Sequence, residues 1–406
     1  MINEIQASLL DIVRYRLFGG DKPKLDNINL IKLLREAQAQ TVYNTVFPFV
    51  EERLKLLAPE RYEAFNERYL AKLIVNTGNY HDHSELDRVL TKAKIPYAVI
   101  KGINSAYYYP DSALRDMGDV DFLVSESDFE RAESAIKELG FKHNHGETGD
   151  THIAYDRPGL SIMEMHRTVN GVPENKAGKL IQAEIDTTIA TARRIEFASV
   201  SCMTADDFHH GLIMLLHTAA HMTKEGIGLR HLCDWAVFVN RFSDKEFRGM
   251  FESKLKSFGL WRFCGILTRT CELYLGIDKK EFVSEINISD SLAERVLGDI
   301  LNGGNFGKKD TNRYREIKYI SDRNDKTVSE RGIASQLLSS VNAKVKDNKL
   351  VKKSKLFYPA GLALESGKYI GLLLTGKRKN TGTAEMLKEA SERKSLYNDL
   401  ELFKKG

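Results

Sequence analysis

The chain has 406 residues, of which 42% are hydrophobic and 29% are charged, and both proportions are ordinary for a globular protein. They exclude collagen-like, mucin-like and wholly disordered chains, and the length suggests about two to four domains. The formal net charge of +4 is too small to indicate a nucleic-acid-binding protein by itself.

The charge is unevenly distributed along the chain. Residues 341–406 contain 15 basic and seven acidic side chains, whereas the rest of the chain has a small acidic excess. A basic tail can contact phosphate or another acidic surface, but a solvated lysine-rich face is the simpler interpretation. The four cysteines form no C-x-x-C pair, which predicts reduced thiols. With no signal-like start and no apolar run of about 20 residues, we expect a cytoplasmic protein without a membrane span.

Apolar residues recur at helical spacing near the start of the chain, and residues 1–86 are predicted to be helical. At Pro96 the pattern changes to short β-favouring runs, so residues 87–200 are predicted to form the next domain. Strands are expected at Tyr97–Ile100, Gly118–Val124, His152–Tyr155, Ser161–His166 and Arg194–Ala198, with a helix at Ser127–Leu139.

Helices return in the second half of the chain. A helical domain is predicted at residues 201–290, and the basic residues 291–406 are expected to be partly helical. The predicted helices lie at His210–Thr223, Leu229–Phe242, 246–276 and Ala384–Phe403. The fold class that follows is α+β: a mixed sheet flanked by helices, with helical regions at both ends.

The segment from Gly118 to Val124 carries the strongest chemical signal. On a strand, Asp119 and Asp121 point to one face, while the apolar residues that alternate with them point to the other. Two neighbouring carboxylates repel each other unless a cation lies between them. Oxygen ligands of this kind suit Mg²⁺. A lone D-x-D on an exposed strand face needs no metal, however, so the context decides between the two interpretations.

That context includes a third acid, Glu164, which is flanked by apolar residues on another predicted strand. Three acids on neighbouring strands can hold two metal ions for an in-line phosphoryl displacement. Farther along, His217 and His221 are four residues apart and share a helix face, which is a spacing that can bind zinc. Packed or substrate-facing histidines are the simpler interpretation. Arg230 and Asp234 have the same spacing and predict a local ion pair.

These residues together resemble a known family, the uncharacterised nucleotidyltransferases of the DNA polymerase β superfamily. Members have a strand that ends in Lys-Gly, then Tyr-Pro, an arginine, a Gly-Asp-x-Asp strand and a later Glu-x-His strand. The matching positions here are Lys101-Gly102, Tyr109-Pro110, Arg115, Gly118–Val124 and Glu164–His166. Residues 226–239 are similar to the helical segment that follows the catalytic domain in that family.

The resemblance implies a site and a reaction. Asp119, Asp121 and Glu164 would be the catalytic residues and would bind two Mg²⁺ ions, for which Mn²⁺ can substitute. Lys101, Gly102, Arg115 and Gly118 would contact the nucleotide, and His166, His217 and His221 would support the site. The enzyme would transfer a nucleoside monophosphate from an NTP, ATP by default, to a hydroxyl acceptor and release pyrophosphate. The acceptor is open: a small molecule, a protein or an RNA. The oligomeric state is not predicted.

Two other functions remain open. The first motif reads Lys-Gly-Ile-Asn from Lys101, whereas the superfamily usually has Gly-Gly or Gly-Ser there. This departure favours a degenerate nucleotide-binding or scaffold protein. A metal-dependent phosphohydrolase that uses His217 and His221 with the carboxylates is the other alternative. For Arg115, an ion pair with Asp111 or Asp116 is as reasonable as a contact with the nucleotide.

Overall fold

The computed structural model describes residues 2–149, 151–159, 161–310, 313 and 383–404. Residues 1–311 and 396–406 form one compact unit, which contains the sheet and the candidate site, and residues 312–395 form a second. In the described part of the chain, no helix combines the length and the apolar character needed to cross a bilayer.

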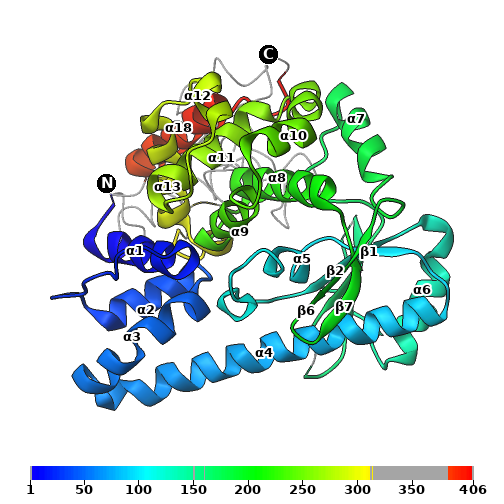
Figure 1. Ribbon diagram of the computed structural model, residues 1–406, viewed down its shortest axis with the longest axis horizontal. Helices are drawn as coiled ribbons and strands as arrows, with labels where there is room; N and C mark the ends of the chain where they lie inside the picture. The colour runs from blue at the N-terminus through cyan, green and yellow to red at the C-terminus, as the bar shows by residue number, and fades with distance from the viewer. Residues whose placement is uncertain (1, 150, 160, 311–312, 314–382, 405–406) are drawn as a thin grey trace, which may run out of the picture. The chain divides into compact units, whose positions relative to one another are not determined.

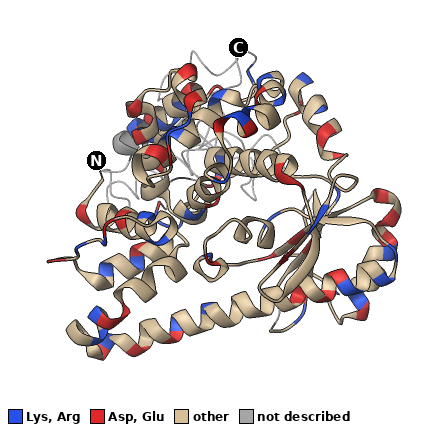
Figure 2. Ribbon diagram, in the orientation of Figure 1, with Lys and Arg blue, Asp and Glu red and all other residues tan. Residues whose placement is uncertain are grey.

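The first four helices precede the sheet, as the apolar spacing predicts. They are α1 (Glu4–Phe18), α2 (Leu30–Ala39), α3 (Tyr43–Leu57) and α4 (Pro59–Lys92). Asn3 caps α1 through a reciprocal pair of hydrogen bonds with Gln6. The long helix α4 runs through residue 86 and lies along the sheet beside β7 (Figure 1). Lysines and arginines are interspersed with aspartates and glutamates along it (Figure 2).

The central sheet has seven strands in the order β3-β4-β5-β2-β1-β7-β6, with parallel and antiparallel neighbours. This confirms the predicted α+β class with a mixed sheet. The strands are β1 (Tyr97–Val99), β2 (Val120–Val124), β3 (Lys142–His143), β4 (His152–Asp156), β5 (Met163–His166), β6 (Arg193–Phe197) and β7 (Val200–Thr204). The helices between them are α5 (Ile103–Ala106), α6 (Phe129–Glu138) and α7 (Lys176–Ile185). Every residue of β2 is buried, as expected of a central strand covered on both faces.

Seven further helices follow the sheet in the part of the chain that the structure describes. They are α8 (Asp207–Lys224), α9 (Leu229–Val239), α10 (Asp244–Phe258), α11 (Trp261–Tyr274), α12 (Glu281–Ile286), α13 (Asp290–Gly303) and α18 (Thr383–Asp399). The single stretch predicted at 246–276 is thus two helices, because Gly259 ends α10 in a left-handed turn. The elements that the apolar pattern did not reveal are β3, β7, α5, α7, α12 and α13.

The helices that precede the sheet along the chain and those that follow it share one hydrophobic core. Buried residues of α1–α3 and of α8–α13 belong to the same cluster, whereas β1, β2, α4 and α6 contribute mainly to a second cluster. Gln40, fully buried at the end of α2, joins the two helical groups: its side chain donates to the Leu301 carbonyl at 3.0 Å and accepts from the Leu229 amide at 3.0 Å. The division into four domains stays a prediction.

The loop after β5 approaches α8 so closely that it requires a glycine. Gly171 has φ +93°, and a Cβ there would lie 2.4 Å from the Leu216 carbonyl oxygen. We expect Gly171→Ala to lower the free energy of unfolding by about 2 kcal/mol or more, because backbone strain and a backbone clash add. The control is Gly159→Ala, which has φ +80° but open space around the new Cβ. Urea unfolding measures the loss of stability in both variants: Gly159→Ala reports the backbone strain alone, and Gly171→Ala reports the strain plus the clash. An equal loss of unfolding free energy in the two variants would contradict this account.

Candidate active site

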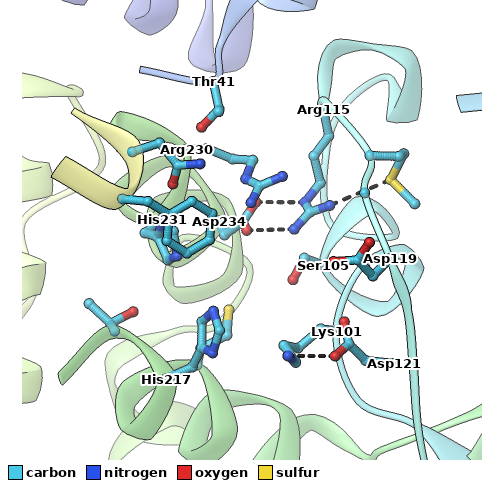
Figure 3. A pocket seen from close by; sticks show the side chains of 17 residues that line it. Thr41, Lys101, Ser105, Arg115, Asp119, Asp121, His217, Arg230, His231 and Asp234 are labelled. Atoms are coloured by element: carbon cyan, nitrogen blue, oxygen red, sulfur yellow. Dashed lines mark hydrogen bonds and ion pairs between the residues drawn. The ribbon is translucent and has the colours of Figure 1, made fainter. Parts of the chain in front are cut away.

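A cavity of about 300 Å³ lies where the chain leaves β1 and enters β2, opposite helices α8 and α9. One wall carries Lys101, Gly102, Arg115, Gly118, Asp119 and Asp121. The other wall carries residues of α8 and α9, among them His217, Arg230, His231 and Asp234 (Figure 3). The pocket therefore brings together most of the residues that the sequence singles out, and it adds others from the helical region.

Asp121 lies on the central strand β2 and is buried. Its direct neighbour on the parallel strand β5 is Glu164, so the two carboxylates occupy adjacent positions on the same face of the sheet. Asp119 directly precedes β2 and is exposed at the pocket. The three predicted acids are thus close in space, although Glu164 does not line the cavity.

Two cationic or proton-bearing groups hold Asp121. The Lys101 Nζ lies 2.5 Å from Asp121 Oδ1, and His166 Nε2 lies 2.9 Å from the same oxygen. Burial alone would raise the pKa of Asp121, but Lys101 and His166 outweigh it and hold this pKa well below its ordinary value. Asp121 is therefore ionised at neutral pH. Lys101 reaches it from the turn after β1, where Gly102 has φ +57° and passes against the Asp119 carbonyl.

Asp119 behaves differently from its neighbour. Desolvation by the surrounding protein, followed by repulsion from Asp121 and Glu164, raises the pKa of Asp119 to about 6. Its carboxylate has no hydrogen bond or ion pair with another described residue. An unneutralised carboxylate next to two others fits an oxygen-ligated divalent cation, because such a cation removes the repulsion. The carboxylate oxygens of Asp119, Asp121 and Glu164 are therefore ligands of the kind that Mg²⁺ prefers, although the three do not lie close enough in this structure to share one ion.

Arg115 does not pair with Asp111 or Asp116. Its guanidinium donates two parallel hydrogen bonds to Asp234 on α9, Nε to Oδ1 and Nη2 to Oδ2, both at 2.8 Å. Tyr109 donates a third hydrogen bond to Asp234 Oδ1 at 2.7 Å. This buried network ties the segment before β2 to α9. The predicted local ion pair of Arg230 with Asp234 is therefore wrong, because Arg115 binds the Asp234 carboxylate instead.

Arg230, which the sequence assigned to a local ion pair, instead lines the pocket. It lies in the first turn of α9, where its amide donates to the Gln40 carbonyl at 3.3 Å. Its guanidinium donates through Nη1 to the Asp116 carbonyl at 2.9 Å, and among the described residues it has no carboxylate partner. Its Nε is buried and finds no hydrogen-bond acceptor among these residues either. Lys101 and Arg115 are already neutralised by aspartates, so Arg230 is the pocket arginine available to an anionic ligand.

The sequence was compared with known proteins. A family model described as "uncharacterised nucleotidyltransferase" matches residues 26–276. The chain belongs to this family. A search of the curated proteins finds no significant match. Among solved structures, one match is an antigenic nucleotidyltransferase-like protein from Paracoccidioides brasiliensis, with 14% sequence identity and a TM-score of 0.30 over 52% of this chain and 94% of that one.

The nucleotidyltransferase family resemblance seen in the motifs is thus confirmed, and the family match extends into the helices after the sheet. Of the residues that it implies, Lys101, Gly102, Arg115, Gly118, Asp119, Asp121 and His217 line the pocket. Glu164, His166 and His221 do not line it. His166 contacts Asp121 without lining the pocket, and His221 pairs with Glu225 at 3.0 Å. Ser105, Arg230, His231 and Asp234 are lining residues that the motifs did not indicate.

His217 and His221 do not form a zinc site with a third ligand in the described part of the chain. There, the one group of His, Cys, Asp or Glu ligand atoms close enough to share a metal is His152, Glu164 and His166. His217 instead stacks on His231, with ring centroids 5.5 Å apart. Burial, followed by the positive charge of Lys101, holds the pKa of His217 well below its ordinary value. His217 therefore presents a neutral ring to the pocket, and these contacts offer no support for the phosphohydrolase alternative.

Buried histidines predict a strong dependence of stability on pH. Burial lowers the pKa of His83 to about 4 and of His210 and His231 to about 3. Below their ordinary pKa of about 6.5, the unfolded chain binds protons that the folded chain does not, so stability falls as pH falls. Each histidine contributes up to about 1.4 kcal/mol per pH unit, a limit that is reached well below pH 6.5. We expect urea unfolding between pH 7 and pH 5 to show this loss.

The matched variants for this measurement are His210→Phe and His81→Gln. His210 is fully buried and stacks on Tyr108, whereas His81 is exposed. The first variant is expected to reduce the slope of stability against pH, averaged between pH 7 and pH 5, by about 1 kcal/mol per unit. The second is expected to leave it unchanged. The same slope in His210→Phe and in the wild type would refute the assignment of a neutral buried ring.

Proposed function

We propose that this chain is a Mg²⁺-dependent nucleotidyltransferase that moves a nucleoside monophosphate from an NTP to a hydroxyl acceptor and releases pyrophosphate. One observation carries the proposal. Asp119 and Asp121 form one wall of a pocket whose other wall holds Arg230, an arginine without a carboxylate partner among the described residues. Such a pocket provides separate places for a cation and for a phosphate.

The family fold and the acidic set support a metal-assisted reaction. Asp119, Asp121 and Glu164 would hold two Mg²⁺ ions, for which Mn²⁺ is expected to substitute. The bound ions would neutralise the charge that develops on the transferred phosphoryl group. Arg230 would hold phosphate oxygens through its free N–H groups, and Lys101, on a flexible side chain, would add a second positive charge.

The reaction balances without another co-reactant. The acceptor oxygen forms a bond to the α-phosphorus, and the bond from that phosphorus to the oxygen that bridges to the β-phosphate breaks. Pyrophosphate leaves with the electron pair, and the hydroxyl proton passes to a carboxylate of the acidic set. The protein residues act mainly by positioning these groups and by neutralising charge. ATP is proposed as the donor by default.

One observation favours a second candidate, a degenerate protein that binds a nucleotide without transferring it. The ammonium of Lys101 lies 2.5 Å from Asp121, where it neutralises a carboxylate that the reaction needs for a metal ion. If Lys101 stays there when a nucleotide binds, the acidic set is incomplete. The difference between the two candidates is whether transfer occurs, because both predict nucleotide binding in the same pocket.

The test uses the full chain with each of the four NTPs labelled at the α-phosphate, with Mg²⁺ or Mn²⁺, and with a cell extract as a source of acceptors. We expect label to move onto an acceptor whose size identifies it as a small molecule, a protein or an RNA. Binding of an NTP without transfer under all these conditions would support the degenerate protein. Neither binding nor transfer would contradict both candidates.

A further inference from the structure

Three potential metal ligands meet on one face of the sheet, next to the catalytic carboxylates. His152 on β4 is the direct partner of His166 on β5, and Glu164 lies two residues before His166 on the same strand. Because strand side chains alternate, all three point to the same face, which is also the face of Asp121. One ligand atom from each of the three lies within 4.8 Å of the others.

The distances between these atoms suit one metal ion. His152 Nε2 is 3.6 Å from Glu164 Oε1, and His166 Nε2 is 3.3 Å from Glu164 Oε2. Four ligands at about 2.1 Å from a tetrahedral metal lie about 3.4 Å from one another. The Nε2 atoms of both histidines thus lie within 4 Å of the glutamate, although His152 Nε2 also lies 2.9 Å from the Glu147 carbonyl, a contact that it gives up when it binds an ion.

The hydrogen-bond partners of His166 point independently to a cation. His166 is 1% exposed. Its Nδ1 lies 3.3 Å from the Thr168 carbonyl, and its Nε2 faces the carboxylates of Asp121 and Glu164. All of these groups are acceptors and a neutral imidazole has a single N–H, so the ring needs either both N–H groups of an imidazolium or a metal ion in place of the Nε2 proton. A metal ion bound at Nε2 satisfies the ring, because Nδ1–H then donates to a backbone carbonyl, the usual outer partner of a metal-binding histidine.

We propose that His152, Glu164 and His166 bind one transition-metal dication, of the Zn²⁺ or Mn²⁺ class, beside the pocket. Imidazole nitrogen suits these metals, whereas Mg²⁺ prefers oxygen ligands throughout. This site goes beyond the proposed nucleotidyl transfer and does not depend on it. Glu164 is the residue that it shares with the acidic set, so the metal fixes the orientation of Glu164.

The experiment measures binding of Zn²⁺ alone to the full chain after treatment with a chelator. Competition with a chromophoric chelator gives the affinity, and substitution with Co²⁺ gives a visible absorption band that reports nitrogen ligation. We expect one Zn²⁺ per chain that excess Mg²⁺ does not displace. Both His152→Ala and Glu164→Gln are expected to weaken Zn²⁺ binding at least tenfold, which corresponds to about 1.4 kcal/mol.

Two control variants test whether the loss of any other histidine weakens Zn²⁺ binding. His221→Ala removes a histidine of the α8 pair, and His145→Ala removes one of two adjacent histidine rings near β3. Both variants are expected to bind Zn²⁺ like the wild type. His152 is partly exposed, so its replacement is expected to leave the fold intact, and a Zn²⁺-induced rise in Tm seen in the wild type but not in His152→Ala gives a second readout.

The inference is overturned if His152→Ala binds Zn²⁺ as tightly as the wild type, if His221→Ala or His145→Ala loses the metal instead, or if the wild type binds neither Zn²⁺ nor Co²⁺. Its failure is distinguishable from that of the proposed function. Asp119 lies outside the three-residue site, so Asp119→Asn is expected to keep Zn²⁺. Nucleotidyl transfer without Zn²⁺ binding would refute only the metal site, and Zn²⁺ binding without transfer would refute only the proposed function.

Discussion

Replacing Asp119 with asparagine is expected to lower the kcat of nucleotidyl transfer at least about 1,000-fold, which corresponds to about 4 kcal/mol of transition-state stabilisation. The reason is electrostatic. Asparagine keeps the size of the side chain but removes the charge that would hold a divalent cation against the transferred phosphate. The measurement is transfer of the α-phosphate label by the purified variant, with Mg²⁺ and then with Mn²⁺.

Asp119 allows a cleaner test than Asp121. Its carboxylate has no hydrogen bond or ion pair with another described residue, whereas Asp121 is held by Lys101 and His166. The Asp119→Asn variant should therefore unfold at the same temperature as the wild type or slightly above it, because it removes repulsion among the acids. The matched control is Asp111→Asn, which lies in the same connection but outside the pocket lining. Full activity in Asp119→Asn would refute the proposed role.

Replacing Arg230 with glutamine is expected to raise the KM for the NTP about 10- to 100-fold, with a smaller effect on kcat. Charge-assisted hydrogen bonds to an ionised group contribute about 1.5–3 kcal/mol, which is the free energy behind that range. Arg230→Lys should restore part of the affinity, since it returns the charge but not the planar fork. Initial rates over a range of NTP concentrations separate the two constants.

The control for Arg230 is Arg241→Gln, which removes an exposed arginine just after the end of the same helix. Because Arg230 also donates to the Asp116 carbonyl, its replacement should cost about 1 kcal/mol of stability, so Tm is measured in parallel. An unchanged KM in a folded Arg230→Gln variant would assign the phosphate contacts to Lys101 instead.

The strand-based part of the site follows from the sequence. Alternation along β2 predicts the side-by-side carboxylates, and a strand that ends in Lys-Gly predicts where Lys101 emerges. The predicted strand at Ser161–His166 places Glu164 in a sheet, and only the pairing register shows that it is the neighbour of Asp121. Register depends on how non-consecutive strands assemble, which a single sequence does not reveal.

The helical wall was harder to predict, because its contacts join distant parts of the chain. Spacing along α9 favours a pair between Arg230 and Asp234, yet Arg115, 119 residues away, binds Asp234 through Nε and Nη2. The planar arginine–carboxylate geometry outweighs the small gain of a local helical pair. No sequence motif identifies Arg230 as a pocket residue. Its role becomes visible only in the structure, where Arg115 occupies Asp234 and leaves Arg230 without a carboxylate partner among the described residues.

The common core of α1–α3 and α8–α13 has a consequence for synthesis on the ribosome. Roughly 150 residues separate the end of α3 from the start of α8, and at about 5–20 residues per second they take some 10–30 seconds to emerge. During that interval the apolar faces of the first three helices have no partner to cover them. The nascent chain is therefore a natural client for chaperones that shield exposed hydrophobic segments until their partners arrive.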